Sequence, residues 1–347
     1  MSAMQVGIIG ATGYGGLELL RLLYNHSKVE TIHLFSSSED GIPFSNKYTH
    51  LRKIIDQPIQ KIEPEALRKL DVIFTSTPSG VSSKLIPEIL NEKVKVIDLS
   101  GDFRIKNTED YEKWYKLPSA PLHIIEKSVY GLTEWNEKQI ENANLIANPG
   151  CYPTAVLLSL LPLLKDNLID SKSLIIDAKS GISGGGNKPN ANNHFCETND
   201  NTSIYKINQH QHIPEIEQAM AMFAEKNNPI TFSTHLVPMN RGIMATSYAN
   251  LQVGVTKEDL YNSLYNKYEK HPFVRVIENT TKINTSQVRG TNYCDIHINV
   301  DERTGRVTII SVIDNLVKGA AGQAIQNMNV MFGYEITTGL TQIPIWI

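Results

Sequence analysis

The sequence predicts an α/β protein in two parts, the first with parallel strands joined by helices and the second with a mostly antiparallel sheet. Three observations support this prediction. An apolar strand at residues 5–9 runs into a glycine-rich turn and a helix. Two further strand-to-turn units follow before residue 105. From Ser173 onward the chain instead carries several strands in succession, and such a change of pattern separates two architectures.

The first element is the strand Gln5–Ile9, followed without a gap by the glycine turn Gly10–Gly16 and by helical apolar spacing over Leu17–Tyr24. In this order, backbone N–H groups at a helix start can hold a pyrophosphate. The glycine spacing is related to the Gly-x-Gly-x-x-Gly pattern without copying it, so a purely structural turn is the alternative. We expect cofactor contacts from Gly10, Ala11, Thr12, Gly13, Tyr14 and Gly15.

The second strand, Thr31–Phe35, ends where a dinucleotide-binding protein selects its cofactor. An NAD-specific site places a carboxylate there, but this chain has Ser36 and Ser38, with its first carboxylates displaced beyond them. Hydroxyl donors without a carboxylate suit the 2′-phosphate of NADP, although no arginine accompanies them. We therefore expect NADP(H), bound in part by these two serines.

Two more strands, Asp71–Phe74 and Lys95–Leu99, end in small polar residues. Open α/β sheets bind ligands at the carboxyl ends of their strands. We therefore expect Thr77 and Pro78, which follow the first of these strands, to contact the cofactor.

A cysteine follows the last strand of this series, Leu145–Ala147. Cys151 lies between Gly150, which permits a sharp bend, and Pro153, which suits the first turn of a helix. The N–H groups and positive dipole end of such a helix favour a thiolate, which can act as a nucleophile facing the nucleotide. The alternative is a buried cysteine that packs as a small apolar side chain.

Composition limits the classes of partner. The chain has 347 residues, enough for two domains, and its 41% hydrophobic and 20% charged residues are ordinary for a globular protein. A net charge of −3 argues against nucleic acid or an anionic membrane as a partner. The longest apolar run, 155–164, is about half a membrane span, and the first ten residues carry no secretory signal. We expect a cytoplasmic protein.

The three cysteines, Cys151, Cys196 and Cys294, are far apart and form no Cys-x-x-Cys pair. This pattern favours neither a disulfide framework nor a cysteine-rich zinc site. The His-x-Cys and His-x-His pairs at 194–196 and 210–212 lack a third ligand at a defined spacing. We therefore expect no metal site.

The second half combines strands, two helices and a glycine-rich loop. The helices are predicted over Glu215–Ala224 and Glu258–Tyr268. The loop Gly184–Gly186, with Ser180 and Ser183 beside it, is interpreted as a close-approach loop at the substrate, the alternative being a flexible loop. The strands are predicted over Leu174–Ala178, Ile230–Val237, Ile243–Val253, Tyr293–Val300 and Arg306–Val312.

His212 is the candidate acid and base. Pro214 followed by Glu215 marks a helix entry, so His212 should lie just outside the first turn. Histidine titrates near neutral pH and can pass a proton to and from an oxygen, whereas a surface capping histidine is the alternative. Residues 314–329 predict a helix rich in small residues. Asn315 before it matches the donor and acceptor of a carboxamide, such as that of nicotinamide.

Six motifs span nearly the whole chain: Gly10–Gly16, Leu99–Arg104, Asn148–Thr154, Ser183–Gly186, His210–Ile216 and Asp314–Ala320. In residues and order they resemble the N-acetyl-gamma-glutamyl-phosphate reductases, of the wider aspartate-semialdehyde dehydrogenase group. The combination of the cysteine and histidine motifs is specific, because the aspartate-semialdehyde enzymes lack the histidine motif. Ser159 and the triple glycine 184–186 depart slightly from the family's pattern.

The resemblance implies a Rossmann-type dinucleotide-binding domain made of residues 1–150 and 315–347. An α+β catalytic domain with a mostly antiparallel sheet, residues 151–314, would be inserted into it and carry the oligomer interface. The implied partners are NADP(H), a small acyl phosphate, inorganic phosphate and further copies of the chain, in a dimer or tetramer.

The resemblance also implies a mechanism. The Cys151 thiolate attacks the acyl phosphate and phosphate departs, leaving a thioester, which NADPH reduces to a thiohemiacetal that collapses to the aldehyde, with His212 as acid and base. The Cys151 N–H and the Asn148 amide would hold the oxyanion. The other residues expected at the substrate are Arg104, Ser183, His210 and Arg241, and those at the cofactor are Ser180, Gly181 and Asn315.

Two rival functions stay open. A related acyl-phosphate reductase of lysine or ornithine biosynthesis would act on a carrier-bound substrate, although no concentrated basic run for docking a carrier is visible. A non-catalytic NADP-sensing protein would not need Cys151 and His212 together.

Overall fold

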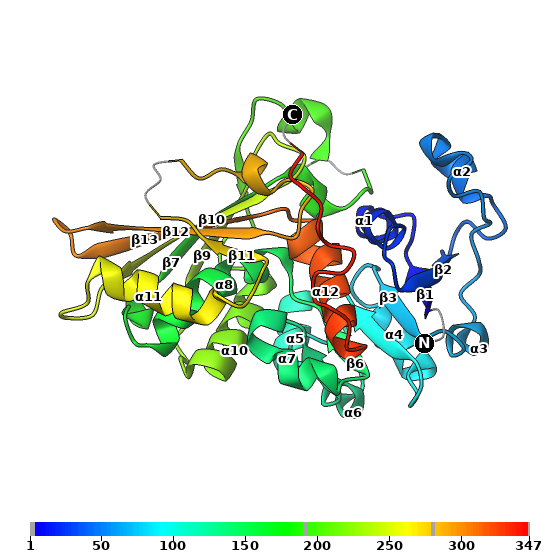
Figure 1. Ribbon diagram of the computed structural model, residues 1–347, viewed down its shortest axis with the longest axis horizontal. Coiled ribbons are helices and arrows are strands. Elements are labelled where there is room, and N and C mark those ends of the chain that lie inside the picture. The colour runs from blue at the N-terminus through cyan, green and yellow to red at the C-terminus, as the bar shows by residue number, and fades with distance from the viewer. Residues whose placement is uncertain (1–3, 190–192, 279–281, 346–347) are drawn as a thin grey trace. The chain divides into compact units, whose positions relative to one another are not determined.

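The chain folds into two compact units (Figure 1). The first is formed by residues 1–148 and 324–340, and the second by residues 149–323 and 341–347. The structure, a computed structural model, describes residues 4–189, 193–278 and 282–345.

The chain returns to the first unit later than the sequence predicts. The predicted boundaries are 150/151 and 314/315, whereas the units divide at 148/149, 323/324 and 340/341, so residues 341–347 belong to the second unit and not to the first. Residues after 314 stay in the second unit because the π-helical turn η6 (Val317–Ala321) packs against the helix that begins at Cys151. Helix α12 (Gly322–Met331) then enters the first unit.

The first unit contains a sheet of six parallel strands in the order β2-β1-β3-β4-β6-β5. This confirms the predicted series of βα units. One strand, β5, was not predicted; it has three residues and pairs with the outer side of β6. The strands are β1 (Met4–Ile9), β2 (Val29–Phe35), β3 (Val72–Thr75), β4 (Lys95–Asp98), β5 (Ser128–Tyr130) and β6 (Leu145–Ala147).

The central strands of this sheet are recognisable in sequence because they are buried. Every residue of β3 is buried, and so is every residue of β1 except Gln5. A strand covered on both faces has a nearly continuous apolar sequence. The helices of this part of the chain are α1 (Tyr14–Leu23), α2 (Phe44–Lys47), η1 (Thr49–Leu51), α3 (Pro64–Leu67), α4 (Ser82–Ile89), α5 (Thr108–Tyr115), α6 (Leu122–Ile125) and α7 (Thr133–Glu141).

Buried polar contacts hold the C-terminal return within the first unit. Asn327 of α12 donates to the carbonyl of Gly131 at 2.9 Å and to the side-chain oxygen of Asn148 at 3.0 Å. It accepts from the hydroxyl of Thr133 at 2.6 Å. A buried amide needs partners of this kind to offset its lost hydration. The last helix therefore completes the polar ends of β5 and β6.

The second unit contains a seven-stranded sheet in the order β11-β12-β13-β10-β7-β9-β8. Within this sheet, only the pairs β7–β9 and β11–β12 of the described strands are parallel, so the predicted mostly antiparallel sheet is confirmed. The three-residue edge strands β8 and β11 were not predicted. The strands are β7 (Ile175–Ser180), β8 (Ser203–Tyr205), β9 (Thr231–Leu236), β10 (Ile243–Asn250), β11 (Val274–Val276), β12 (Cys294–Asp301) and β13 (Arg306–Ile313).

Helix α8 (Cys151–Lys165) is the centre of this unit. It is buried from residue 152 to 164 and packs against β10, β13 and two other helices.

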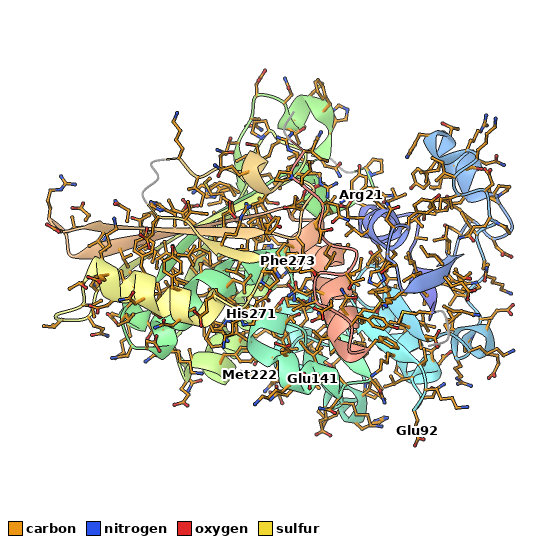
Figure 2. All side chains as sticks on the ribbon, viewed as in Figure 1. Arg21, Glu92, Glu141, Met222, His271 and Phe273 are labelled. Atoms are coloured by element: carbon orange, nitrogen blue, oxygen red, sulfur yellow. The ribbon has the colours of Figure 1, made fainter. Side chains whose placement is uncertain are left out.

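The labelled side chains of Figure 2 include Phe273, which is 1% exposed, and Met222, which is 46% exposed. The remaining helices are η2 (Ser171–Ser173), η3 (Ile182–Gly185), α9 (Phe195–Thr198), α10 (His212–Ala224), α11 (Lys257–Tyr268) and η5 (Thr285–Val288).

No helix within residues 4–189, 193–278 and 282–345 has the length and apolar character needed to cross a membrane.

Candidate active site

In the first unit the glycine turn forms a tight cradle at the start of α1. Gly10 has a φ of +79°, a left-handed conformation, and a Cβ there would overlap the carbonyl oxygen of Ser76. A Cβ on Gly15 would come within 2.5 Å of Ser76 Oγ. Gly13 caps α1, whose first turn contains no acidic residue. The cradle thus leaves bare backbone at a positive helix end, which fits a pyrophosphate.

Other residues of the expected cofactor set surround this turn. Ala11 is buried, and the carbonyl of Thr12 accepts from Tyr48 Oη at 2.7 Å. Tyr14 is 41% exposed at the first position of α1. After β3, the Thr77 hydroxyl lies 3.0 Å from the hydroxyl of Ser82. Pro78 is the next residue, in the loop that leads to α4.

The end of β2 presents hydroxyl groups. Ser36 is buried, and its Oγ accepts from the N–H of Ser38 at 3.4 Å. The first carboxylate beyond these serines, Glu39, forms an ion pair with Lys47 of α2. A cation that the sequence analysis did not consider therefore lies beside the segment expected to bind a 2′-phosphate.

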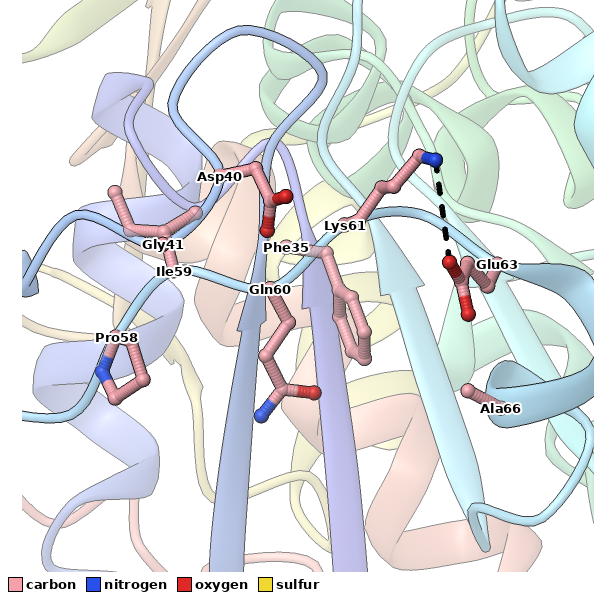
Figure 3. A pocket seen from close by; sticks show the side chains of 9 residues that line it. All are labelled: Phe35, Asp40, Gly41, Pro58, Ile59, Gln60, Lys61, Glu63 and Ala66. Atoms are coloured by element: carbon pink, nitrogen blue, oxygen red, sulfur yellow. Dashed lines mark ion pairs between the residues drawn. The ribbon is translucent and has the colours of Figure 1, made fainter.

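A cavity of ≈ 410 Å³ lies beside the end of β2 (Figure 3). Phe35 and Gln60 line it, and Lys61 forms an ion pair with Glu63 at 4.0 Å at the same cavity. Gln60 pairs with Phe35 in a parallel bridge. This cavity was not predicted, because its lining includes a segment, 58–66, that carries no motif. Phe35 itself is 2% exposed, so its ring belongs mainly to the buried core of the unit.

In the second unit, Cys151 is the first residue of α8, as predicted. Gly150 caps the helix with φ −67° and ψ 157°, and its carbonyl accepts from the N–H of Thr154 at 3.0 Å. The first turn of α8 contains no acidic residue. The helix dipole and the N–H groups of this turn therefore favour the thiolate of Cys151, which is partly exposed.

The imidazole of His212 lies directly against the residue before the cysteine. A Cβ on Gly150 would come within 2.5 Å of His212 Nε2. On another side, a Cβ on Gly319 of η6 would come within 2.8 Å of Cys151 Cβ. Because Gly150 and Gly319 have no side chains, there is room for the His212 ring and the Cys151 side chain. The structure brings together the predicted nucleophile and the predicted acid and base.

The histidine helix begins earlier than predicted. His212 is the first residue of α10, not a residue outside its first turn. The physical reason is a hydrogen bond that the sequence analysis missed, because the N–H of His212 donates to Nδ1 of His210 at 3.1 Å. This side-chain acceptor caps the helix upstream of Pro214.

His210 is a buried neutral ring. Burial, followed by the nearby charge of Lys206, lowers the pKa of His210 to about 3. The rings of Tyr152, Tyr205 and Phe232 surround it at centroid distances of 5.5 to 5.7 Å. The expected contact with a substrate anion therefore cannot rest on a positive charge at this residue. His210 acts instead as a hydrogen-bond acceptor for the start of α10.

Arg241 is held by a buried carboxylate. Its Nε and Nη2 donate to the two oxygens of Asp314 at 2.9 and 3.1 Å. Asp314 is fully buried and also accepts from the N–H groups of Gly290 and Leu316. The side chain of Arg241 stays 23% exposed. The guanidinium is therefore fixed in one orientation while part of it faces solvent.

The amide of Asn315 is engaged within the second unit. Its Oδ1 accepts from the N–H of Gly242 at 2.7 Å, and its Nδ2 donates to Ser183 Oγ at 3.0 Å. The oxygen that was expected to pair with nicotinamide thus has a partner in the chain. Ser180 donates to the carbonyl of Gly181 at 2.9 Å at the end of β7. These contacts fix the loop that carries Ser183.

Arg104 and Asn148 belong to the first unit. Arg104 is buried, and its guanidinium donates to the carbonyls of Asn148 at 2.7 Å and of Leu99 at 2.8 Å. The side-chain oxygen of Asn148 accepts from Asn327. Both residues therefore organise the ends of β4 and β6.

The sequence analysis missed the partners that orient the expected site residues. Glu215 is fully buried and accepts from the N–H of Gly150 at 2.7 Å. Asp314 orients Arg241, and Tyr205 donates to the hydroxyl of Tyr152 at 3.1 Å. Glu215 and Asp314 could have been considered, because each lies within one of the six motifs, whereas Arg241 and Tyr205 lie in segments that carry no motif. Within the described residues, no group of three His, Cys, Asp or Glu side chains is arranged to hold a metal.

Two family models match the chain. The semialdehyde dehydrogenase NAD binding domain matches residues 5–143, and the semialdehyde dehydrogenase dimerisation domain matches residues 151–315. The N-acetyl-gamma-glutamyl-phosphate reductase of Geobacillus sp. (strain WCH70) is 54% identical over 99% of this chain and 100% of its own. The enzyme of the same name from Bacillus subtilis (strain 168) is 51% identical over the same shares.

Solved structures share the fold at low identity. Aspartate semialdehyde dehydrogenase II from Vibrio cholerae, complexed with ASA, has a TM-score of 0.73 and 17% identity, covering 96% of this chain and 99% of that one. Aspartate semialdehyde dehydrogenase with NADP from Candida albicans has a TM-score of 0.70 and 18% identity, covering 96% and 100%. These matches agree with a nucleotide-binding parallel sheet joined to a second domain with a mixed sheet.

Proposed function

Because the chain belongs to the semialdehyde dehydrogenase family and, within it, to the N-acetyl-gamma-glutamyl-phosphate reductases, we propose that Cys151 and His212 carry its chemistry. The enzyme is an oxidoreductase of arginine biosynthesis. It converts N-acetyl-L-glutamyl 5-phosphate to N-acetyl-L-glutamate 5-semialdehyde with a nicotinamide cofactor. The observation that carries the proposal is the His212 ring packed against Gly150, the cap of the helix that Cys151 begins.

The first step uses the helix start. The Cys151 thiolate attacks the acyl carbon, and the C–O bond to phosphate breaks. Inorganic phosphate departs, and the acyl group stays on Cys151 as a thioester. The N–H groups in the first turn of α8 stabilise the oxyanion that develops on the carbonyl oxygen. The first turn of α8 itself holds no carboxylate, although the Glu215 carboxylate accepts from the N–H of Gly150 at the cap of this helix.

The second step reduces the thioester. When bound, the reduced nicotinamide supplies the hydride. His212 delivers a proton to the oxygen of the resulting thiohemiacetal and takes it back as the C–S bond breaks, which releases the aldehyde and the thiolate. Arg241, held by Asp314, and Ser183, held by Asn315, orient the substrate; a guanidinium pairs well with its carboxylate or phosphate.

We assign NADP(H) as the cofactor, bound by the glycine turn and by Ser36 and Ser38 of the first unit. The absence of a carboxylate at position 36 supports this choice, and the first carboxylate beyond it, Glu39, is paired with Lys47. Ser36→Asp should lower the ratio of kcat/KM for NADPH to that for NADH by about tenfold or more, because the new carboxylate repels the 2′-phosphate. An unchanged ratio would remove Ser36 from the site.

The domain roles follow from this assignment. The first unit binds the cofactor, and the second carries the chemistry and the contact between subunits, since the dimerisation-domain match covers residues 151–315. We expect a dimer or tetramer in the cytoplasm. Light scattering on the purified protein measures the number of subunits.

The deciding experiment follows phosphate-dependent oxidation of N-acetylglutamate semialdehyde as NADPH formation. The native enzyme should be active, and Cys151→Ala should be inactive while still binding NADP. If neither protein is active but both bind NADP, the substrate assignment fails, and the carrier-bound substrate of the lysine pathway becomes the next assay. If Cys151→Ala keeps its activity, Cys151 is not the nucleophile.

A further inference from the structure

Glu215 connects the two groups that the proposed mechanism uses. Its carboxylate accepts from the N–H of Gly150 at 2.7 Å, and Gly150 immediately precedes Cys151. Glu215 also lies on α10 three residues after His212, one helical turn along the same face. One side chain therefore ties the cap of the nucleophile's helix to the helix of the acid and base.

The contact is buried and close packed. Glu215 is 0% exposed, and His212 is 8% exposed. Gly150 meets α10 at two points, because its N–H donates to Glu215 and its Cα faces the His212 ring. A buried carboxylate is costly unless it forms strong hydrogen bonds. A backbone N–H at the start of a helix is such a donor.

The carboxylate also brings charge near the reacting groups. The other titratable groups on these elements are His212 and Glu217 of α10, Cys151, Tyr152 and Lys165 of α8, and Tyr205, Lys206 and His210 before α10. We infer that Glu215 is a positioning residue that fixes Cys151 relative to His212 and supplies a negative charge that stabilises the His212 imidazolium. The inference rests on the roles proposed above for Cys151 and His212.

The sign of the charge effect is the same for both partners. A nearby negative charge disfavours a thiolate and favours an imidazolium, so it raises both pKa values. Glu215→Gln keeps an oxygen that accepts from Gly150 but removes the charge. The pH at which Cys151 forms its thiolate and the pH at which His212 loses its proton should then both fall, by about one unit.

The test measures the rate at which iodoacetamide alkylates Cys151 as a function of pH. A Cys196→Ser background removes the exposed second thiol, and Cys151→Ala gives the blank. The matched control is Glu217→Gln, because Glu217 also lies on α10 and accepts a backbone N–H, that of Ile230, at 3.0 Å. We expect Glu215→Gln to shift the alkylation profile toward acid and Glu217→Gln to leave it in place.

Steady-state kinetics with the semialdehyde tests the positioning role. Glu215→Ala removes the acceptor and should lower kcat by on the order of 10²-fold, more than Glu215→Gln, with KM little changed. Glu215→Asp keeps the charge, so its alkylation profile should stay close to the native one although kcat falls. This variant provides the comparison if the glutamine variant does not fold.

Two results would overturn the inference. One is a Glu215→Gln profile that coincides with the native and Glu217→Gln profiles. The other is a fall in activity of Glu215→Gln and Glu217→Gln that is equal in the two variants and is fully explained by a loss of folded protein. Because alkylation needs no substrate, the first of these results is independent of the proposed reaction. Absence of semialdehyde oxidation in the native enzyme would count against the proposed function alone.

Discussion

The glycine-to-helix junctions before α1 and before α8 belong to different units, and they are similar in sequence but different in structure. Before α1, Gly10 has a φ of +79°, and a Cβ would overlap a backbone carbonyl. Before α8, Gly150 has φ −67° and ψ 157°, which any residue can adopt. Its missing side chain instead makes room for the ring of His212.

The difference shows that one sequence signal has two physical causes. A positive φ is a local property, and glycine is expected wherever a turn requires it. Space for a side chain from another helix depends on tertiary packing, and no residue near Gly150 in the sequence predicts that the His212 ring packs there. The first junction therefore concerns the shape of the backbone, whereas the second concerns the distance between two reacting groups.

The largest expected effect is a loss of catalysis through a change at the second junction, with no change at the first. His212→Ala should lower kcat by about 10²- to 10⁴-fold, the usual contribution of a general acid and base. The affinity for NADP, measured by fluorescence titration, should not change, because the cradle belongs to the other unit. A fall of less than about fivefold would mean that another group transfers the proton.

Gly150→Ala tests the second junction directly. The backbone can accept alanine without strain, but the new methyl group must displace the His212 ring. We expect kcat to fall by on the order of 10²-fold, with little change in thermal stability. The comparison would be wrong if kcat is retained, or if the protein unfolds instead.

Gly10→Ala should give the opposite pattern. The positive φ and the clash with Ser76 should lower the free energy of unfolding by about 1–3 kcal/mol and weaken NADP binding. The pH profile of Cys151 alkylation should be unchanged. Urea denaturation and cofactor titration measure the first two effects, and an altered alkylation profile would show that the junctions are coupled.

The smallest effect concerns His210, which supports only the second junction. Its pKa is lowered to about 3 by burial and then by Lys206, so between about pH 3 and 6.5 the unfolded chain binds a proton that the folded chain does not. Stability therefore falls as the pH is lowered through this range. Between pH 7 and 5 the loss should be about 2 kcal/mol.

His210→Gln should remove most of this pH dependence, because glutamine does not titrate. Urea denaturation of both proteins at pH 7 and 5 gives the difference. Equal losses in the two proteins would place the proton uptake on other groups.

The sequence was informative where the cause of a structure is local. Buried apolar runs predict β1 to β4 and β6, and Pro153 after a glycine predicts the helix start at Cys151. The three-residue strands β5, β8 and β11 were missed because their pairing depends on a neighbour already in place. The hydrogen bonds of Glu215 and Asp314 were missed for the same reason, since each joins elements far apart in the chain.

The hydrogen bonds of Asn327 can form only late in the synthesis of the chain, because Asn327 lies in the last helix. As the ribosome releases the chain, residues 1–148 emerge first, but Gly131, Thr133 and Asn148 lack the partner that Asn327 supplies until the last helix appears. The inserted second unit is almost complete by then. The first segment made is thus among the last to reach its final hydrogen bonding, and it must remain soluble while the rest of the protein is translated.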